Sequence, residues 1–289
     1  MKFNKILLGC ISSIIIFGMV ITSCQKLDRP VLKELILDPP PPALTFFNEK
    51  SYFPFDGNAR DTGEYKLATT TKNISFVQGV TEGQAAQIGT DGYVSVSNLN
   101  AGLKSPGSLS LAFWMNGATG PVQGGAQGLF AISNSTQFWG NLEIFLENYD
   151  DASDPNAVFM KIHMFNANVT GGGEEWIQDD NVKLKNVLGK WTHIALTYDA
   201  ATSKLTLYKD GVATGVNNMV LGGGSYGDLK FDNVTGMVLG SFAFQTNPSF
   251  TNHGPETWAK SFNGSLDQFR IYNKALSAAE VNNLFANKL

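Results

Sequence analysis

The sequence predicts an all-β protein, a two-sheet antiparallel sandwich of the jelly-roll type with a short C-terminal helix. Two observations support this fold class. From residue 43 onward, apolar and polar residues alternate in short segments that are separated by Gly, Asn and Asp. Hydrophobic residues make up 43% of the chain, which is enough for a core, whereas only 16% are charged, against about 25% in typical domains.

The alternating segments are expected to be strands, because side chains of period two point to opposite faces of a sheet. They cover 109–115, 142–147, 158–165, 191–198, 204–209, 236–242 and 265–272. Asp210-Gly211 follows one of them and has the residue types of a type I′ hairpin turn. A helix is predicted after Ser277, which forms a capping box with Glu280. Its apolar stripe consists of Val281, Leu284 and Phe285.

The N-terminus is predicted to be a lipoprotein signal peptide over residues 1–23. Lys2 and Lys5 precede an apolar segment at 6–21, which is shorter than the roughly 20 residues of a membrane span. The residues Ile-Thr-Ser before Cys24 resemble a bacterial lipobox, which implies cleavage there and lipidation of the Cys24 thiol. An uncleaved anchor helix with an incidental cysteine is the alternative.

Two further parts follow the signal peptide. Residues 24–42 are expected to be a lipid-anchored tether that ends in four prolines, and residues 43–289 to be one domain. The expected location is the outer membrane, with the domain on the cell surface or facing the periplasm. Cleavage removes Cys10 and lipidation occupies Cys24, which excludes a cysteine nucleophile, a cysteine zinc site and redox chemistry. A net charge of −4 without a basic run argues against a nucleic-acid partner.

Segments 110–115, 191–211 and 262–277 carry a family resemblance. They read SLAFWM, WTHIALTYD followed by KLTLYKDG, and FNGSLDQFRIYNKALS. In this order they resemble the core and the ending of laminin-G-like domains, which are concanavalin A-like jelly rolls found in bacterial surface proteins of glycan-uptake systems. The resemblance implies a non-catalytic carbohydrate-binding module that binds a polysaccharide or oligosaccharide, with outer-membrane uptake proteins as further partners. A protein-interaction module without a sugar site is the alternative, and a diverged glycoside hydrolase is a third possibility.

Three tryptophans are candidate platforms for a sugar ring. Trp139, Trp176 and Trp258 lie in loop-like contexts, where an exposed indole would stack on the apolar face of a sugar. Core packing is the alternative interpretation of each indole.

Two strands present a mixed aromatic and charged face that adds further candidate glycan contacts. These candidates are Glu143, Phe145, Glu147, Lys161 and His163. If the strands 142–147 and 158–165 are neighbours, Lys161 is expected to pair with a glutamate. A solvated outer face is the alternative.

The sequence predicts no catalytic residue. Glu143 and Glu147 have the spacing of the outer glutamates in the E-x-D-x-E motif of related β-glucan hydrolases, but Phe145 replaces the central aspartate. Four residues of strand separate their positions by about 13 Å, against about 5–5.5 Å between the carboxyl groups of a retaining pair. His193 lies within the family core motif and is interpreted as structural.

A structural Ca²⁺ ion is the one cofactor that the sequence suggests. Asp56, Asn58 and Asp61 place oxygen ligands around a tight turn, and Ca²⁺ takes six to eight oxygens. The family resemblance adds Asp267 as a further ligand. A turn whose Asp and Asn side chains cap its own backbone is the alternative.

Overall fold

The computed structural model describes residues 49–214 and 219–288, so the predicted signal peptide and tether lie outside the described residues. The fold is mostly β, as the sequence predicts. Within the described residues, no helix is long and apolar enough to cross a membrane.

The strands of the first half of the domain are β1 Ser51–Phe53, β2 Thr70–Gln78, β3 Gln84–Val96, β4 Leu109–Gly117, β5 Ala126–Ile132, β6 Leu142–Asn148, β7 Val158–Phe165 and β8 Glu174–Ile177. Those of the second half are β9 Lys183–Leu184, β10 Thr192–Asp199, β11 Lys204–Lys209, β12 Val212–Ala213, β13 Met219–Val220, β14 Met237–Leu239, β15 Ala259–Ser261 and β16 Gly264–Tyr272. The α-helices are α1 Ala101–Lys104 and α2 Ala278–Ala286, and the 3-10 helices are η1 Asp180–Val182, η2 Leu221–Gly224 and η3 Ala243–Gln245.

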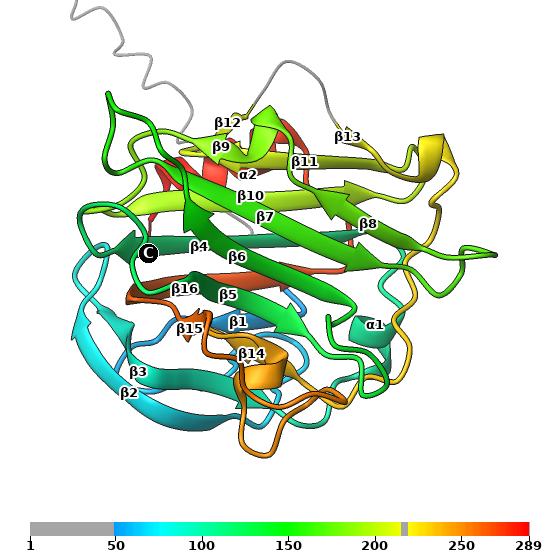
Figure 1. Cartoon of the computed structure of the whole chain (residues 1–289), viewed down its shortest axis with the longest axis horizontal. Coiled ribbons are helices and arrows are strands. Elements are labelled where there is room, and N and C mark those ends of the chain that lie inside the picture. The colour runs from blue at the N-terminus through cyan, green and yellow to red at the C-terminus, as the bar shows by residue number, and fades with distance from the viewer. Residues whose placement is uncertain (1–48, 215–218, 289) are drawn as a thin grey trace, which may run out of the picture. The chain divides into compact units, whose positions relative to one another are not determined.

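The strands form one curled sheet in the order β12-β11-β10-β4-β16-β3-β14-β5-β6-β7-β8. Figure 1 shows that β5, β6, β7 and β8 lie in front of β4, β10 and β16, so the curl produces two facing layers. Strand β3 joins the layers, because its beginning pairs with β16 and its end pairs with β14. All pairs are antiparallel except β5 with β15, which is parallel.

The main core lies between the two layers and is built from alternate residues of each strand. On β7 these are Val158, Met160, Ile162 and Met164, all fully buried, as the alternation predicts. Phe269 of β16 stacks on Phe113 of β4 at 4.8 Å and on Phe130 of β5 at 5.3 Å, so its ring connects the two layers. Burying each such side chain contributes about 1.5–3 kcal/mol.

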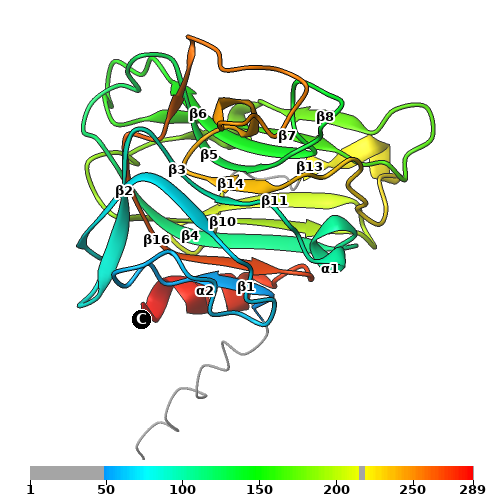
Figure 2. The same cartoon turned by 90° about the horizontal axis from the view of Figure 1, so that it is seen from below.

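The outer faces of the two layers are covered by different elements, which Figure 2 shows on opposite sides of the molecule. Helix α2 covers β4, β10, β11 and β16, and its Val281 and Leu284 are buried against Ala112 and Ala195. The predicted capping box is present, with Ser277 accepting from the Glu280 amide. The segment between β14 and β15 covers the outer face of the other layer and creates the site described below.

Most predicted strand positions are confirmed to within two residues. Asp210 and Gly211 both have positive φ and join β11 to β12, as the hairpin prediction requires. The predicted strand 236–242 is shorter, because Gly240 leaves the strand at φ +80° after Leu239. The long strands β2 and β3 are not among the strands that the sequence analysis predicts.

Candidate glycan-binding site

An aromatic cluster covers the outer face of β5, β6, β7 and β8. It consists of Phe138, Trp139, Phe145, Trp176, Phe242, Phe244 and Trp258. Phe145 points outward because its neighbours on β6, Ile144 and Leu146, point into the core. Trp139 stacks on Phe145 at 5.7 Å and meets Trp176 edge-on at 4.9 Å. The rings therefore support one another as a single apolar layer.

Trp258 is the exposed member of the aromatic cluster, with 39% of its surface accessible. Its ring lies 5.8 Å from that of Phe244 and 5.9 Å from that of Trp139. Its backbone carbonyl accepts a hydrogen bond of 2.9 Å from the Ala126 amide. A side chain at Gly125 would come within 2.0 Å of that same carbonyl. The start of β5 thus fixes the residue that precedes β15.

A groove of about 530 Å³ lies beside this indole, and we call it the Trp258 groove. Its lining consists of Val122, Gly125, Ala126, Glu147, Asn148 and Trp258. The groove combines an exposed aromatic ring with a carboxylate and an amide. An aromatic ring flanked by a few well-placed polar groups is a suitable arrangement for a small ligand.

A second cavity of about 420 Å³ adjoins the Trp258 groove, because both are lined by Asn148. The remaining lining residues are Pro121, Tyr149, Asp150, Asp151, Ala152 and Pro155. We call the two cavities together the extended groove.

The predicted pairing of Lys161 with a glutamate is confirmed. Strands β6 and β7 are neighbours, and Lys161 Nζ lies 2.8 Å from Glu147 Oε2. The pair is partly exposed at the surface, which leaves Glu147 in the lining of the Trp258 groove. A carboxylate held in this way is a fixed acceptor for a ligand hydroxyl.

Glu143, Phe145 and His163 lie beneath the cluster surface, with exposed fractions of 0%, 2% and 0%. Neither oxygen of Glu143 has a hydrogen bond of normal geometry, although the amides of Ala243 and Gly140 favour its charge weakly. Burial raises the pKa of Glu143 to about 8. Glu143 and His163 therefore lie under the aromatic cluster, Phe145 is its buried member on β6, and none of the three lines the groove.

His163 is held between a carboxylate and an indole. Its Nε2 lies 3.1 Å from Glu174 Oε1, and its ring centroid lies 4.6 Å from that of Trp176. Burial lowers the pKa of His163, while Glu174 opposes that shift. The same Glu174 oxygen accepts from Trp176 Nε1 at 3.3 Å, so it orients both rings.

The three predicted tryptophans are brought together, but they differ in their surroundings. Trp176 lies on strand β8 instead of in a loop, where it is half-buried beside Trp139. Only Trp258 and Glu147 of the eight predicted glycan contacts line the extended groove. The sequence interpretation missed Asn148 and the loop at 121–125. The polar run Glu-Asn-Tyr-Asp-Asp at 147–151, directly after a strand, is the signal that could have indicated them.

Glu143 and Glu147, which share the sequence spacing of the hydrolase motif, are arranged differently from a catalytic pair. Glu143 has no exposed surface, whereas Glu147 lines the groove and is bound to Lys161. His193 is fully buried beneath α2, with its ring 5.1 Å from Trp114. Burial lowers the pKa of His193 to about 3, so the ring is neutral there.

The four predicted calcium ligands have different partners. Asp61 accepts backbone hydrogen bonds from Tyr52, Gly63 and Leu67, and Asn58 caps the amide of Arg60. These two side chains behave as the capped-turn alternative requires.

Asp56 and Asp267 both contact the turn between β2 and β3. Asp56 accepts from the amide of Gln84, and Asp267 accepts from that of Val80. Burial, helped by the nearby charge of Asp56, raises the pKa of Asp267 to about 6. In the described part of the chain, no group of three or more His, Cys, Asp or Glu side chains is arranged to hold a metal. Asp56 and Asp267 thus contact the same turn, and a Ca²⁺ ion held by Asp56, Asn58, Asp61 and Asp267 stays a prediction.

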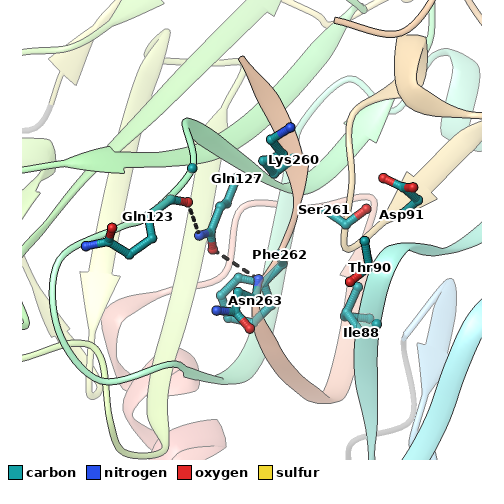
Figure 3. Close-up of a pocket in the computed structure, with 11 residues that line it drawn as sticks. Ile88, Thr90, Asp91, Gln123, Gln127, Lys260, Ser261, Phe262 and Asn263 are labelled. Atoms are coloured by element: carbon teal, nitrogen blue, oxygen red, sulfur yellow. Dashed lines mark hydrogen bonds between the residues drawn. The ribbon is translucent and has the colours of Figure 1, made fainter. Parts of the chain in front are cut away.

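A different cavity of about 320 Å³ is lined by Lys260 and Ser261 of β15 (Figure 3). Gln127 donates to the Gln123 carbonyl and accepts from the Asn263 amide, so it holds the cavity wall. Lys260 lines this cavity and the adjoining one of about 600 Å³, which also contains Lys72. The cavities that β15 lines thus contain lysines, whereas no lysine is among the described residues that line the extended groove.

The chain belongs to the concanavalin A-like lectin/glucanases superfamily, because the laminin-G family model with that description matches residues 88–282. This confirms the resemblance stated above. No curated protein sequence matches the chain.

Solved structures share the fold at low sequence identity. Domain 4 of AbnA, a GH43 extracellular arabinanase from Geobacillus stearothermophilus solved with arabinotriose, is 18% identical with a TM-score of 0.54, over 82% of this chain and 98% of that one. The binding domain of Paraclostridial Mosquitocidal Protein 1 is 16% identical, with a TM-score of 0.55 over 82% and 52%. The binding domain of botulinum neurotoxin DC, solved with rat synaptotagmin II, is 13% identical, with a TM-score of 0.52 over 83% and 51%.

Proposed function

We propose that the domain is a carbohydrate-binding module that holds a glycan in the Trp258 groove. The observation that carries this proposal is the exposed indole of Trp258, fixed over an aromatic cluster and bordered by Glu147 and Asn148. A sugar has an apolar face of C–H groups and an edge of hydroxyls. The indole would receive the face, while the carboxylate and amide would bind the hydroxyls.

The fold neighbours support binding as the general role. The arabinanase domain was solved with a trisaccharide, and the neurotoxin domain was solved with a protein. A protein-interaction module therefore remains the competing function. The exposed indole in the Trp258 groove favours sugar binding over that function.

The proposal extends to the setting of the domain. The sequence features around Cys24 support a lipid-anchored protein of the bacterial outer membrane. The tether would hold the domain where polysaccharides arrive, and outer-membrane uptake proteins would receive them.

Replacing the indole tests the proposed function directly. We expect Trp258→Ala to weaken the retention of a bound polysaccharide in affinity electrophoresis by about tenfold or more, which corresponds to about 1.4 kcal/mol. Trp191→Ala is the matched control, because Trp191 directly precedes β10 in the other layer and lines neither part of the extended groove.

The outcomes separate the candidate functions. Equal retention of both variants would remove the Trp258 groove as the site. Failure of a broad polysaccharide panel would favour the protein-interaction module. Release of reducing sugar that disappears in Glu147→Gln would show a hydrolase.

A further inference from the structure

The extended groove carries carboxylates and no cationic side chain. Glu147, Asp150 and Asp151 contribute to its lining, and no Lys or Arg is among the described residues that line either part. The ligand of this groove would therefore meet acceptors along its whole path.

The lysines around these carboxylates are engaged, and one of them, Lys183, lies over the Tyr149 ring at 5.7 Å and pairs with Asp180 outside the groove lining. Lys161 Nζ lies 2.8 Å from Glu147, and Lys185 Nζ lies 2.6 Å from Asp151. The Lys185 contact also holds the pKa of Asp151 well below its usual range, so this pair keeps its charges at neutral pH. Lys161 and Lys185 are therefore already bound to carboxylates of the groove and would not bind an anionic group of the ligand.

Asp150 is the carboxylate that gives the extended groove its net negative charge. Among the described residues it has no ion pair within 4.0 Å, and it accepts a hydrogen bond from the side-chain amide of Asn148. It lines the same cavity as the paired Asp151 and the shared lining residue Asn148. An acidic sugar bound here would be repelled by this carboxylate, because no Lys or Arg in the described part of the chain forms an ion pair with it.

The cavities that β15 lines show that the contrast is local. Lys72 and Lys260 line these cavities, together with Asp91 and Glu256. The scarcity of cations is therefore a property of the extended groove and not of this end of the domain.

We infer that the extended groove selects an uncharged stretch of polysaccharide longer than one sugar and rejects acidic polysaccharides, with Asp150 as the specificity-determining residue. This inference rests on the proposed function. The ligand spans two cavities joined at Asn148, with the Trp258 indole in one and Asp150 in the other. A neutral chain places hydroxyl donors opposite the carboxylates, whereas a uronate places charge against charge.

The test compares one polysaccharide in two charge states. The intact protein is run in affinity gels with arabinan, xylan, mannan and β-glucan, and with the carboxymethylated derivative of each. We expect each neutral polymer that is retained to bind at least tenfold more tightly than its carboxymethylated form. This difference in affinity between the neutral and the carboxymethylated polymer should shrink when salt is raised from about 0.02 M to about 0.5 M, because salt screens exposed charges.

Asp150→Asn identifies the residue responsible. We expect this nearly isosteric variant to lower the ratio of affinities for the neutral and the carboxymethylated polymer by threefold or more. The variant should still bind the neutral polymer. Asp91→Asn, in a cavity that β15 lines, is the matched control and should leave this ratio unchanged.

Failure of the inference and failure of the proposed function look different. Equal, Trp258-dependent retention of neutral and carboxymethylated polymers overturns the inference and leaves the proposed function standing. An unchanged difference in Asp150→Asn also overturns the role given to Asp150. Retention of no polymer of either kind overturns both proposals.

Discussion

Glu143 is a carboxyl group with no exposed surface, and its contribution to stability depends on pH. Burial raises the pKa of Glu143 from about 4.5 in the unfolded chain to about 8 in the fold. Between these values the folded state binds the proton and the unfolded state releases it. The free energy of unfolding therefore falls as pH rises through this window.

We predict that Glu143→Gln removes this fall in the free energy of unfolding with rising pH. The variant should match the wild type near pH 4.5 and exceed its stability by up to a few kcal/mol near pH 8.5, because the amide carries no proton to lose. Urea unfolding across this range measures the effect. Glu147→Gln, on the same strand but partly exposed, should change stability by about 1 kcal/mol or less at either pH. A pH slope in Glu143→Gln equal to that of the wild type would contradict the prediction.

At the scale of elements, the parallel pair of β5 and β15 positions the exposed indole. The pair joins Ala126 to Ala259, segments that lie more than a hundred residues apart in the chain. Gly125 has φ +117°, and its neighbour is the Trp258 carbonyl. Only glycine adopts this backbone at such a close approach without strain.

We predict that Gly125→Ala lowers both stability and glycan affinity, because a Cβ placed 2.0 Å from the Trp258 carbonyl must push β5 and β15 apart. The loss of affinity should be about tenfold, measured beside a circular dichroism spectrum that confirms folding. Gly120→Ala is the control, since Gly120 also has positive φ but has no atom within 4 Å of the added Cβ. It should cost about 1–2 kcal/mol through strain and leave affinity unchanged. Equal affinities of the two variants would argue against this positioning role.

Elements of the fold with strict alternation could be predicted from the sequence, and the groove could not. Strand β7 and the capped helix α2 follow local patterns, so their positions are confirmed. Strand β3 bends from one layer to the other, and its polar residues and glycines interrupt the alternation. The close approach of Gly125 to the Trp258 carbonyl depends on the parallel pairing of distant segments, which no local sequence pattern encodes. The sequence therefore indicates which aromatic residues matter but not which of them is exposed.

At the scale of the whole molecule, packing holds the domain together without disulfides. The chain has two cysteines, Cys10 and Cys24, and both precede the first described residue. One core cluster lies between the layers, another lies under α2, and the aromatic cluster lies on the opposite outer face. Both cysteines lie outside the described residues, and lipidation of Cys24, which the lipobox resemblance implies, stays a prediction.

We predict that Cys24→Ala abolishes lipid attachment and releases the protein from the membrane fraction. A bacterial host grown with alkyne-tagged palmitate should label the wild type and not this variant, because the predicted lipid attachment uses the Cys24 thiol. Cys10→Ala is the matched control. It should remain labelled and membrane-bound, since cleavage before Cys24 discards residue 10 whatever its identity. Label retained in Cys24→Ala would place the modification elsewhere. An unlabelled wild type of uncleaved mass would instead support an anchor helix.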